Sequence, residues 1–247
     1  MSDLGFPYES FRPGQRELSD KVYETVKSGG LLVVKAPTGY GKTAAILYGA
    51  LRADPEWIIY VVRTVNELDP VIRELKRFGV DYTFLFSARK SCPLLDASVA
   101  GLSNEDFWEN CRLARLKEAC SYYEGAEKLD ARGLIEYMRG HYSFHSLRLA
   151  RDISRFLGAC PFFSLKSLVG EVGIIVATYP YLFRRDIFEA MLEQVELGDS
   201  VVIVDEAHSL LSIHEMLEAR INKRDIDAAI REAEKVSDSV PEARSVL

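Results

Sequence analysis

One short segment of this sequence has the residue types and the spacing that bind phosphate groups. Glycines let a backbone approach a phosphate closely, a lysine places positive charge on it, and a threonine offers its hydroxyl to magnesium. The pattern is that of a P-loop whose first glycine is replaced by alanine, and it predicts a site for ATP and Mg²⁺. The candidate residues are Ala36, Pro37, Thr38, Gly39, Tyr40, Gly41, Lys42 and Thr43.

A second segment supplies the carboxylates that such a site needs. The apolar run 201–204 leads into Asp-Glu-Ala-His at 205–208. Acids at the carboxyl end of a buried strand lie where parallel sheets bind ligands. Asp205 is suited to hold magnesium, and Glu206 to orient and deprotonate an attacking water. Alone, two solvated acids at a strand end would explain this segment equally well. The candidate catalytic residues are Lys42, Asp205, Glu206 and His208.

Apolar runs that alternate with helical patterns predict the elements that position these motifs. Continuous apolar strands separated by helices imply a parallel sheet covered on both faces, so the predicted fold class is α/β. A strand directly before the P-loop and a helix directly after it are the required context. The predicted strands are 31–35, 57–62, 81–86, 172–177 and 201–204, and the predicted helices are 18–26, 44–51 and 70–77.

The alternation breaks after Phe86, and about 85 residues pass before the strand at Val172. A structureless loop of that length is implausible in a compact domain, so residues 87–171 are predicted to form a mainly helical insertion. The insertion contains every cysteine of the chain, and their spacing lacks the close pair common in zinc sites. On spacing alone, zinc, an iron–sulfur cluster and unconnected core cysteines all stay open. The four are Cys92, Cys111, Cys120 and Cys160.

A shared cysteine site would constrain the local fold. Cys111 and Cys120 are nine positions apart. On one straight helix they would face opposite sides, about 13 Å apart along the axis. If they hold one cluster, the helix through residues 112–117 must end or turn before Cys120.

Composition describes an ordinary globular chain. Its 247 residues are 48% hydrophobic and 28% charged, which allows one large domain with an insertion. No apolar run reaches the roughly 20 residues of a membrane span, and no signal-peptide pattern is visible, so a cytoplasmic protein without a membrane partner is expected. The net charge of −6 argues weakly against nucleic-acid binding. Basic residues gather between Arg139 and Lys166, where a solvated helix face is the simplest interpretation.

Taken together, these motifs resemble those of superfamily 2 helicases, in which alanine opens the first motif and Asp-Glu-Ala-His forms the second. Three further segments resemble the XPD-like, iron–sulfur DNA helicases. Residues 11–15 are similar to the family's glutamine motif, residues 61–67 to its motif Ia, and residues 177–182 to the segment after its iron–sulfur insertion. The resemblance covers nearly the whole chain and implies a RecA-like fold.

The resemblance also implies roles for individual residues. Gln15 would contact adenine, and the four cysteines would hold a 4Fe–4S cluster. Arg63 and Tyr179 would lie along the path of single-stranded DNA, through phosphate contact and stacking respectively. Arg89 would lie near the cluster and the DNA. Core packing is the alternative for Tyr179, and a surface salt bridge is the alternative for Arg63.

The same resemblance implies how the chain is organised. Residues 1–86 and 172–208 would form the first RecA-like motor domain, 87–171 the iron–sulfur insertion, and 209–247 the start of a helical Arch-like region. ATP in this family binds between two motor domains, and the second is missing from this chain. We therefore expect a monomeric 5′–3′ DNA helicase motor that acts in DNA repair and is nucleoid-associated if the protein is prokaryotic. This chain by itself is not expected to unwind DNA. The alternatives are a non-catalytic iron–sulfur module that binds nucleotide and DNA, and a DinG-like helicase.

Overall fold

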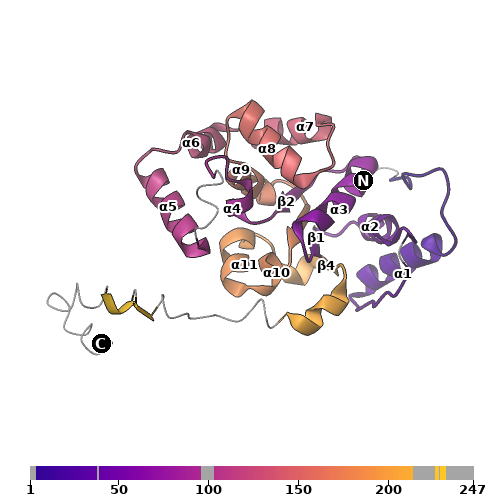
Figure 1. Cartoon of the computed structure of the whole chain (residues 1–247). Coiled ribbons are helices and arrows are strands. Elements are labelled where there is room, and N and C mark those ends of the chain that lie inside the picture. The colour runs from indigo at the N-terminus through magenta and orange to yellow at the C-terminus, as the bar shows by residue number, and fades with distance from the viewer. Residues whose placement is uncertain (1–3, 38, 96–102, 214–225, 228, 232–247) are drawn as a thin grey trace. The chain divides into compact units, whose positions relative to one another are not determined.

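Four parallel strands form the sheet at the centre of this α/β structure (Figure 1). The structure is a computed structural model that describes residues 4–37, 39–95, 103–213, 226–227 and 229–231. The predicted α/β class with a parallel sheet is confirmed. The strands are β1 (Trp57–Val62), β2 (Thr83–Leu85), β3 (Ile174–Thr178) and β4 (Ser200–Val204), in the order β2-β3-β1-β4.

The register of the sheet brings three distant chain segments together at its carboxyl edge. Val62 of β1 pairs with Thr178 of β3, and Val61 pairs with Val204 of β4. In parallel sheets this edge is where ligands bind. The residues that follow these strand ends are Arg63, Tyr179 and Asp205.

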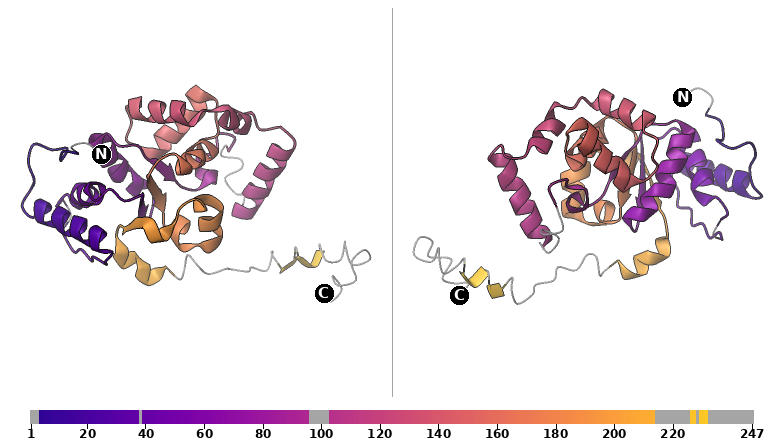
Figure 2. Two further views of the ribbon diagram at one scale, coloured as in Figure 1. Left: turned by 180° about the vertical axis from the view of Figure 1, so that it is seen from behind. Right: turned by 45° about the horizontal axis from the view of Figure 1, so that its top comes forward.

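Helices lie on both sides of the sheet. Two of them, α1 and α2, lie to one side, and the insertion helices α5 and α6 lie to the other, in every view (Figures 1 and 2). Outside the insertion the helices are α1 (Gln15–Ser28), α2 (Lys42–Arg52), α3 (Leu68–Phe78), α10 (Pro180–Phe183) and α11 (Arg185–Leu192). The 3-10 turns there are η1 (Val65–Glu67), η3 (Leu197–Asp199) and η4 (Ala207–Ser212).

The apolar run at 31–35 does not form the strand that the sequence predicts. Residues 31–37 have no regular secondary structure, and Leu31 and Val33 are 91% and 83% exposed. A strand needs a neighbour to share main-chain hydrogen bonds, and no described strand pairs with this segment. Within the described residues β4 pairs with β1 alone, and Val202 at its centre is 40% exposed. The predicted strand is therefore wrong for this structure, and one edge of β4 has no partner strand among the described residues.

The described part of the insertion is helical, as its pattern predicts. Helix α5 ends at Leu116, where Glu118 takes a positive φ of 52° and the Ala119 amide donates to the Ala114 carbonyl at 2.8 Å. The chain therefore turns before Cys120, as a shared cysteine site requires. The elements are α4 (Ala88–Ser91), α5 (Asn104–Leu116), α6 (Ser121–Lys128), α7 (Ala131–Gly140), α8 (Ser146–Leu157), α9 (Pro161–Ser167) and η2 (Leu168–Gly170).

The chain divides into two compact units, residues 1–208 and 209–247. The sheet and the insertion helices belong to the first unit, and the predicted boundaries of the insertion at 87 and 171 stay predictions. Of the second unit the structure describes residues 209–213, 226–227 and 229–231. Among the described residues, no helix combines the length and the apolar character needed to cross a membrane.

Candidate functional site

A cavity of about 780 Å³ opens where the P-loop, α3 and the end of β4 meet. Its volume lies within the range of small-molecule sites. Ala36 and Pro37 do not line it, and Thr38 lies outside the described residues. The predicted nucleotide and catalytic residues that line the cavity are Gln15, Gly39, Tyr40, Gly41, Lys42, Thr43, Asp205, Glu206 and His208.

The P-loop is shaped by two glycines and supported by the segment before α1. Gly39 and Gly41 have φ values of 81° and 82°, a region that side chains with a Cβ rarely adopt. The Arg12 guanidinium donates to the Gly39 carbonyl at 2.6 Å, and the Gln15 amide donates to the carbonyls of Tyr40 and Gly41, both at 3.1 Å. Gly41 precedes α2, so the first amides of that helix are placed to bind an anion at the loop.

The two acids of the second motif lie opposite the P-loop lysine. Glu206 has its carboxylate 3.9 Å from the Lys42 ammonium and 3.3 Å from the Nδ1 of His208. Asp205 accepts a hydrogen bond from the Tyr60 hydroxyl at 3.2 Å. Glu206 takes a φ of 50°, which places it in a tight turn directly after β4. The structure thus brings the four predicted catalytic residues to one cavity.

Sequence reasoning missed Tyr60 and Arg12. Tyr60 lies in the middle of β1, and its ring is buried. Burial and the Asp205 carboxylate raise the pKa of Tyr60 well above its ordinary value, while the hydroxyl of Thr43 acts in the opposite direction. The phenol is therefore a proton donor that lies between the two predicted magnesium ligands. A tyrosine within an apolar strand gives no local signal of such a role. Arg12 belongs to the predicted glutamine motif, but its bond to the P-loop depends on the fold.

The predicted DNA residues lie in different environments. Arg63 lines the cavity formed by the P-loop, α3 and the end of β4, which we call the nucleotide cavity after its predicted ligand. Its guanidinium lies 3.4 Å from Glu67. Tyr179 is 1% exposed, and its hydroxyl donates to the main-chain carbonyl of Asp205. Its ring is therefore not available to a base in this structure, and its stacking role stays a prediction. Arg89 lies in α4, three positions before Cys92.

Gln15 also differs from its implied role. Its side chain is buried, and its amide is bonded to the P-loop at one end and to the Arg12 main-chain amide at the other. In this structure the Gln15 side chain therefore links the P-loop to the segment before α1. Its predicted contact with adenine stays a prediction.

The four cysteines line one cavity in the insertion. They come from the end of α4, the body of α5 and the residues that precede α6 and α9. Aromatic side chains close the cavity, and the rings of Trp108 and Phe162 lie 5.3 Å apart, edge to face, near it. The main-chain amide of Cys160 donates to the Tyr122 carbonyl at 2.6 Å, which ties the start of α9 to α6. Four cysteines that are far apart in sequence therefore line the same cavity.

The thiols are suited to a soft metal only if the metal stabilises their charge. Burial raises the pKa of Cys160 to about 11 and raises the pKa values of Cys92 and Cys111 as well. Without a cation these thiols are protonated at neutral pH, and a bound metal would have to hold them as thiolates. Within the described residues, no three Cys, His, Asp or Glu side chains converge closely enough to ligate one ion.

Comparisons with known proteins agree on one group of helicases. Residues 60–226 match the DEAD_2 family. The ATP-dependent DNA helicase XPD of Sulfolobus acidocaldarius is 29% identical over 230 residues, which is 90% of this chain and 37% of that protein. The XPD helicase subunit of the general transcription and DNA repair factor IIH of Arabidopsis thaliana is 25% identical over 265 residues. That match covers 95% of this chain and 34% of the relative.

Solved structures agree with the sequence relatives. A structure described as an XPD helicase superposes with a TM-score of 0.67 at 25% identity, over 94% of this chain and 40% of that one. A structure described as a truncated XPD has a TM-score of 0.61 at 23% identity, which supports the fold alone. The chain thus spans little more than a third of the length of the curated relatives named above.

Proposed function

Because this chain belongs to the DEAD_2 family, we propose that it is the first motor domain of an XPD-like, ATP-dependent DNA helicase. The observation that carries the proposal is the meeting of Lys42, Thr43, Asp205 and Glu206 at one cavity. These residues come from two segments far apart in sequence, and together they provide what phosphoryl transfer to water requires.

Each of these side chains has a distinct task in the proposed reaction. Lys42 and the amides at the start of α2 bind the β- and γ-phosphates. Thr43 and Asp205 offer a hydroxyl and a carboxylate, which are the oxygen ligands that Mg²⁺ prefers, so the donor set fits this ion. When bound, the ion would neutralise charge on the phosphates. Glu206 orients the attacking water and accepts its proton. His208 lies beside Glu206 and positions that carboxylate.

A substitution of Glu206 tests this assignment directly. Glu206→Gln keeps the shape of the side chain and removes its basicity. We expect binding of a fluorescent ATP analogue to be retained and ATP hydrolysis to be lost. Lys42→Ala should lose both. If the chain joined to a second motor domain still unwinds DNA at the normal rate with Glu206→Gln, the catalytic proposal fails and a non-catalytic nucleotide-binding module remains.

The second motor domain supplies the other half of the proposed ATP site. An arginine contributed from such a partner domain is worth about 10³ to 10⁵ in rate. The chain on its own should therefore bind nucleotide weakly, hydrolyse it slowly and not separate DNA strands. Strand displacement by the isolated chain at a rate typical of a helicase would contradict this view. The proposed polymer partner is single-stranded DNA, which Arg63, Arg89 and Tyr179 would contact.

For the cysteine cavity we propose a 4Fe–4S cluster held by Cys92, Cys111, Cys120 and Cys160. Four cysteines from four segments at one aromatic-lined cavity support this ligand set. When bound, the cluster would cross-link these segments and could exchange one electron. Anaerobically purified protein should be brown and contain iron and labile sulfide in equal amounts. A colourless protein with stoichiometric zinc would instead assign the cysteines to a zinc site.

A further inference from the structure

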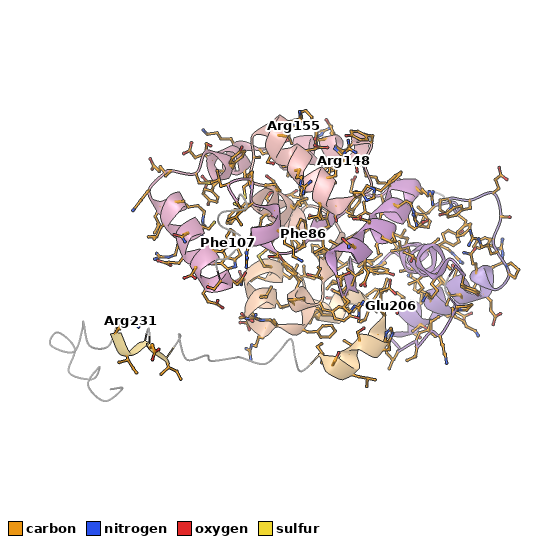
Figure 3. All side chains as sticks on the ribbon, in the orientation of Figure 1. Phe86, Phe107, Arg148, Arg155, Glu206 and Arg231 are labelled. Atoms are coloured by element: carbon orange, nitrogen blue, oxygen red, sulfur yellow. The ribbon has the colours of Figure 1, made fainter. Side chains whose placement is uncertain are left out.

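The outward face of α8 carries a group of arginines that the nucleotide site does not use. Leu149, Ala150 and Ile153 of this helix are buried, so the opposite face points to solvent. Residues three or four positions apart share one face of a helix. On the outward face these positions hold Arg148, Arg151 and Arg155, all of them exposed. Figure 3 shows Arg148 and Arg155 along α8, away from Glu206 in the nucleotide cavity.

In the described part of the chain, one acid lies within ion-pair distance of this face. The single acid of α8, Asp152, is buried and lies 2.9 Å from His141. Arg148 reaches Asp152 only at 3.9 Å. No residue in the described part of the chain pairs with the guanidinium of Arg151. The face therefore stays basic in a chain whose net charge is −6.

Exposed aromatic rings lie at both ends of this basic face. Tyr142 is 66% exposed, and the Arg148 guanidinium lies 4.8 Å from its ring centroid. Phe156 is 63% exposed, and Arg155 lies 5.4 Å from its ring centroid. Each guanidinium lies within cation–π distance of its ring, so charge and ring are adjacent at both places. The rings and the charges therefore form one surface.

We propose that this surface, the α8 face with Tyr142 and Phe156, is a second binding site for single-stranded DNA, separate from the nucleotide cavity. Arg148 and Arg155 lie about 10 Å apart along the helix axis, so the three arginines form a basic track that can follow the backbone of one strand. Stacking on aromatic rings combined with a basic track is how proteins bind single strands without sequence preference. Duplex DNA would engage the arginines but would offer no free base to the rings. The proposal rests on the proposed function, in which the chain acts on DNA.

Charge reversal on this face tests the proposal. Binding of a labelled oligothymidylate to the full 247-residue chain is followed by fluorescence anisotropy at several salt concentrations. Arg151→Glu with Arg155→Glu should weaken binding at least tenfold. It should also lower the salt slope by about 1.4, since each phosphate contact contributes about 0.7. The control, Lys21→Glu with Lys27→Glu on the exposed side of α1, makes the same charge change elsewhere.

A second pair of variants tests whether the aromatic rings contribute to binding. Tyr142→Ala and Phe156→Ala should each weaken single-strand binding by about tenfold and leave duplex binding unchanged. If neither does, the site binds phosphates without bases and the single-strand assignment is wrong. If Arg151→Glu with Arg155→Glu binds the oligothymidylate with wild-type affinity, or if the α1 control loses as much affinity, the proposed α8 site is wrong. Absence of DNA binding by the unmodified chain would instead overturn the proposed function, and this inference with it. Unchanged circular dichroism and nucleotide binding confirm that each variant is folded.

Discussion

A single phenol group connects the two predicted magnesium ligands. Tyr60 projects from β1 toward Asp205 at the end of β4, and Thr43 at the start of α2 lies beside it. Because the ring is buried, its position is fixed by the sheet rather than by solvent. A donor held in this way orients the carboxylate that it contacts, and such support often decides the affinity of a metal site.

Removal of this hydroxyl should therefore weaken magnesium binding more than it weakens the fold. For Tyr60→Phe we expect about a tenfold higher Mg²⁺ requirement for nucleotide binding, with a loss of about 1 kcal/mol in the free energy of unfolding. The matched control is Tyr82→Phe, because the buried Tyr82 hydroxyl has no hydrogen-bond partner among the described residues. That variant should be neutral or slightly stabilised. An unchanged Mg²⁺ requirement in Tyr60→Phe would refute the orienting role.

Substitutions of two glycines can separate an effect on nucleotide binding from an effect on backbone strain. A Cβ added at Gly41 would lie 2.2 Å from the Gln15 amide nitrogen, whereas one at Gly79 would meet nothing within 4 Å. Both glycines have positive φ, so alanine at either position costs about 1–2 kcal/mol in backbone strain. We expect Gly41→Ala to lose nucleotide affinity by tenfold or more, because it also displaces Gln15 from the loop. Gly79→Ala should bind nucleotide normally, and equal nucleotide affinities in isothermal titration would argue against this mechanism.

At the scale of elements, α3 is shared by the nucleotide cavity and the insertion. Arg73 and Arg77 on one side of the helix line the cavity. One turn before Arg73, Asp69 accepts hydrogen bonds from the amide and the hydroxyl of Ser146, both at 2.8 Å, at the start of α8. Lys76 donates to the carbonyls at the end of α7. A displacement of α3 on nucleotide binding would therefore also move the start of α8 and the end of α7, which are hydrogen-bonded to it.

The Lys76 contact gives a measurable test of this attachment. Its ammonium lies 2.7 Å from the Met138 carbonyl and 2.5 Å from the His141 carbonyl, and burial lowers its pKa. Lys76→Met leaves both carbonyls without this donor, which should destabilise the chain by about 1–3 kcal/mol. Hydrogen exchange should rise in α7 and α8 more than in α1. Lys21→Met removes an exposed pair with Glu17 and should cost less than about 0.5 kcal/mol. Uniform exchange across the first unit of the Lys76 variant would contradict a local attachment.

The elements that sequence predicts well are those with a local signal. The helix after the P-loop and the strands around Tyr60, Phe84 and Val176 follow from continuous apolar runs, and the structure contains them. The run at 31–35 has the same signal, but a strand forms only when a neighbour shares its hydrogen bonds, so propensity alone misleads there. Conversely, the bond between Tyr60 and Asp205 joins residues 145 positions apart. Its partners are known only once the sheet register is known.

At the scale of the whole molecule, the proposed ATP site is expected to need a second motor domain to complete it. The nucleotide cavity is formed within residues 1–208, and the chain spans 37% of its Sulfolobus relative. The motifs predict phosphate binding and water activation at this site, since phosphate loops and paired acids are recognisable as short segments. They could not predict which contacts support those motifs, because Arg12, Tyr60 and α3 reach the site through the fold.

The open edge of β4 and the exposed segment at 31–35 also bear on how the protein behaves in concentrated solution. An uncovered strand edge offers unpaired amides and carbonyls to other chains, and exposed apolar residues such as Leu31 and Val33 favour association as well. We expect dilute protein to be monomeric and light scattering to rise with concentration. Leu31→Lys with Val33→Lys should suppress that rise, whereas Leu116→Lys, a similar change on α5, should not. If the two variants scatter light equally, aggregation begins elsewhere. If the Leu31 and Val33 variant alone scatters less light, the exposed segment and the β4 edge limit the concentration at which this chain stays monomeric.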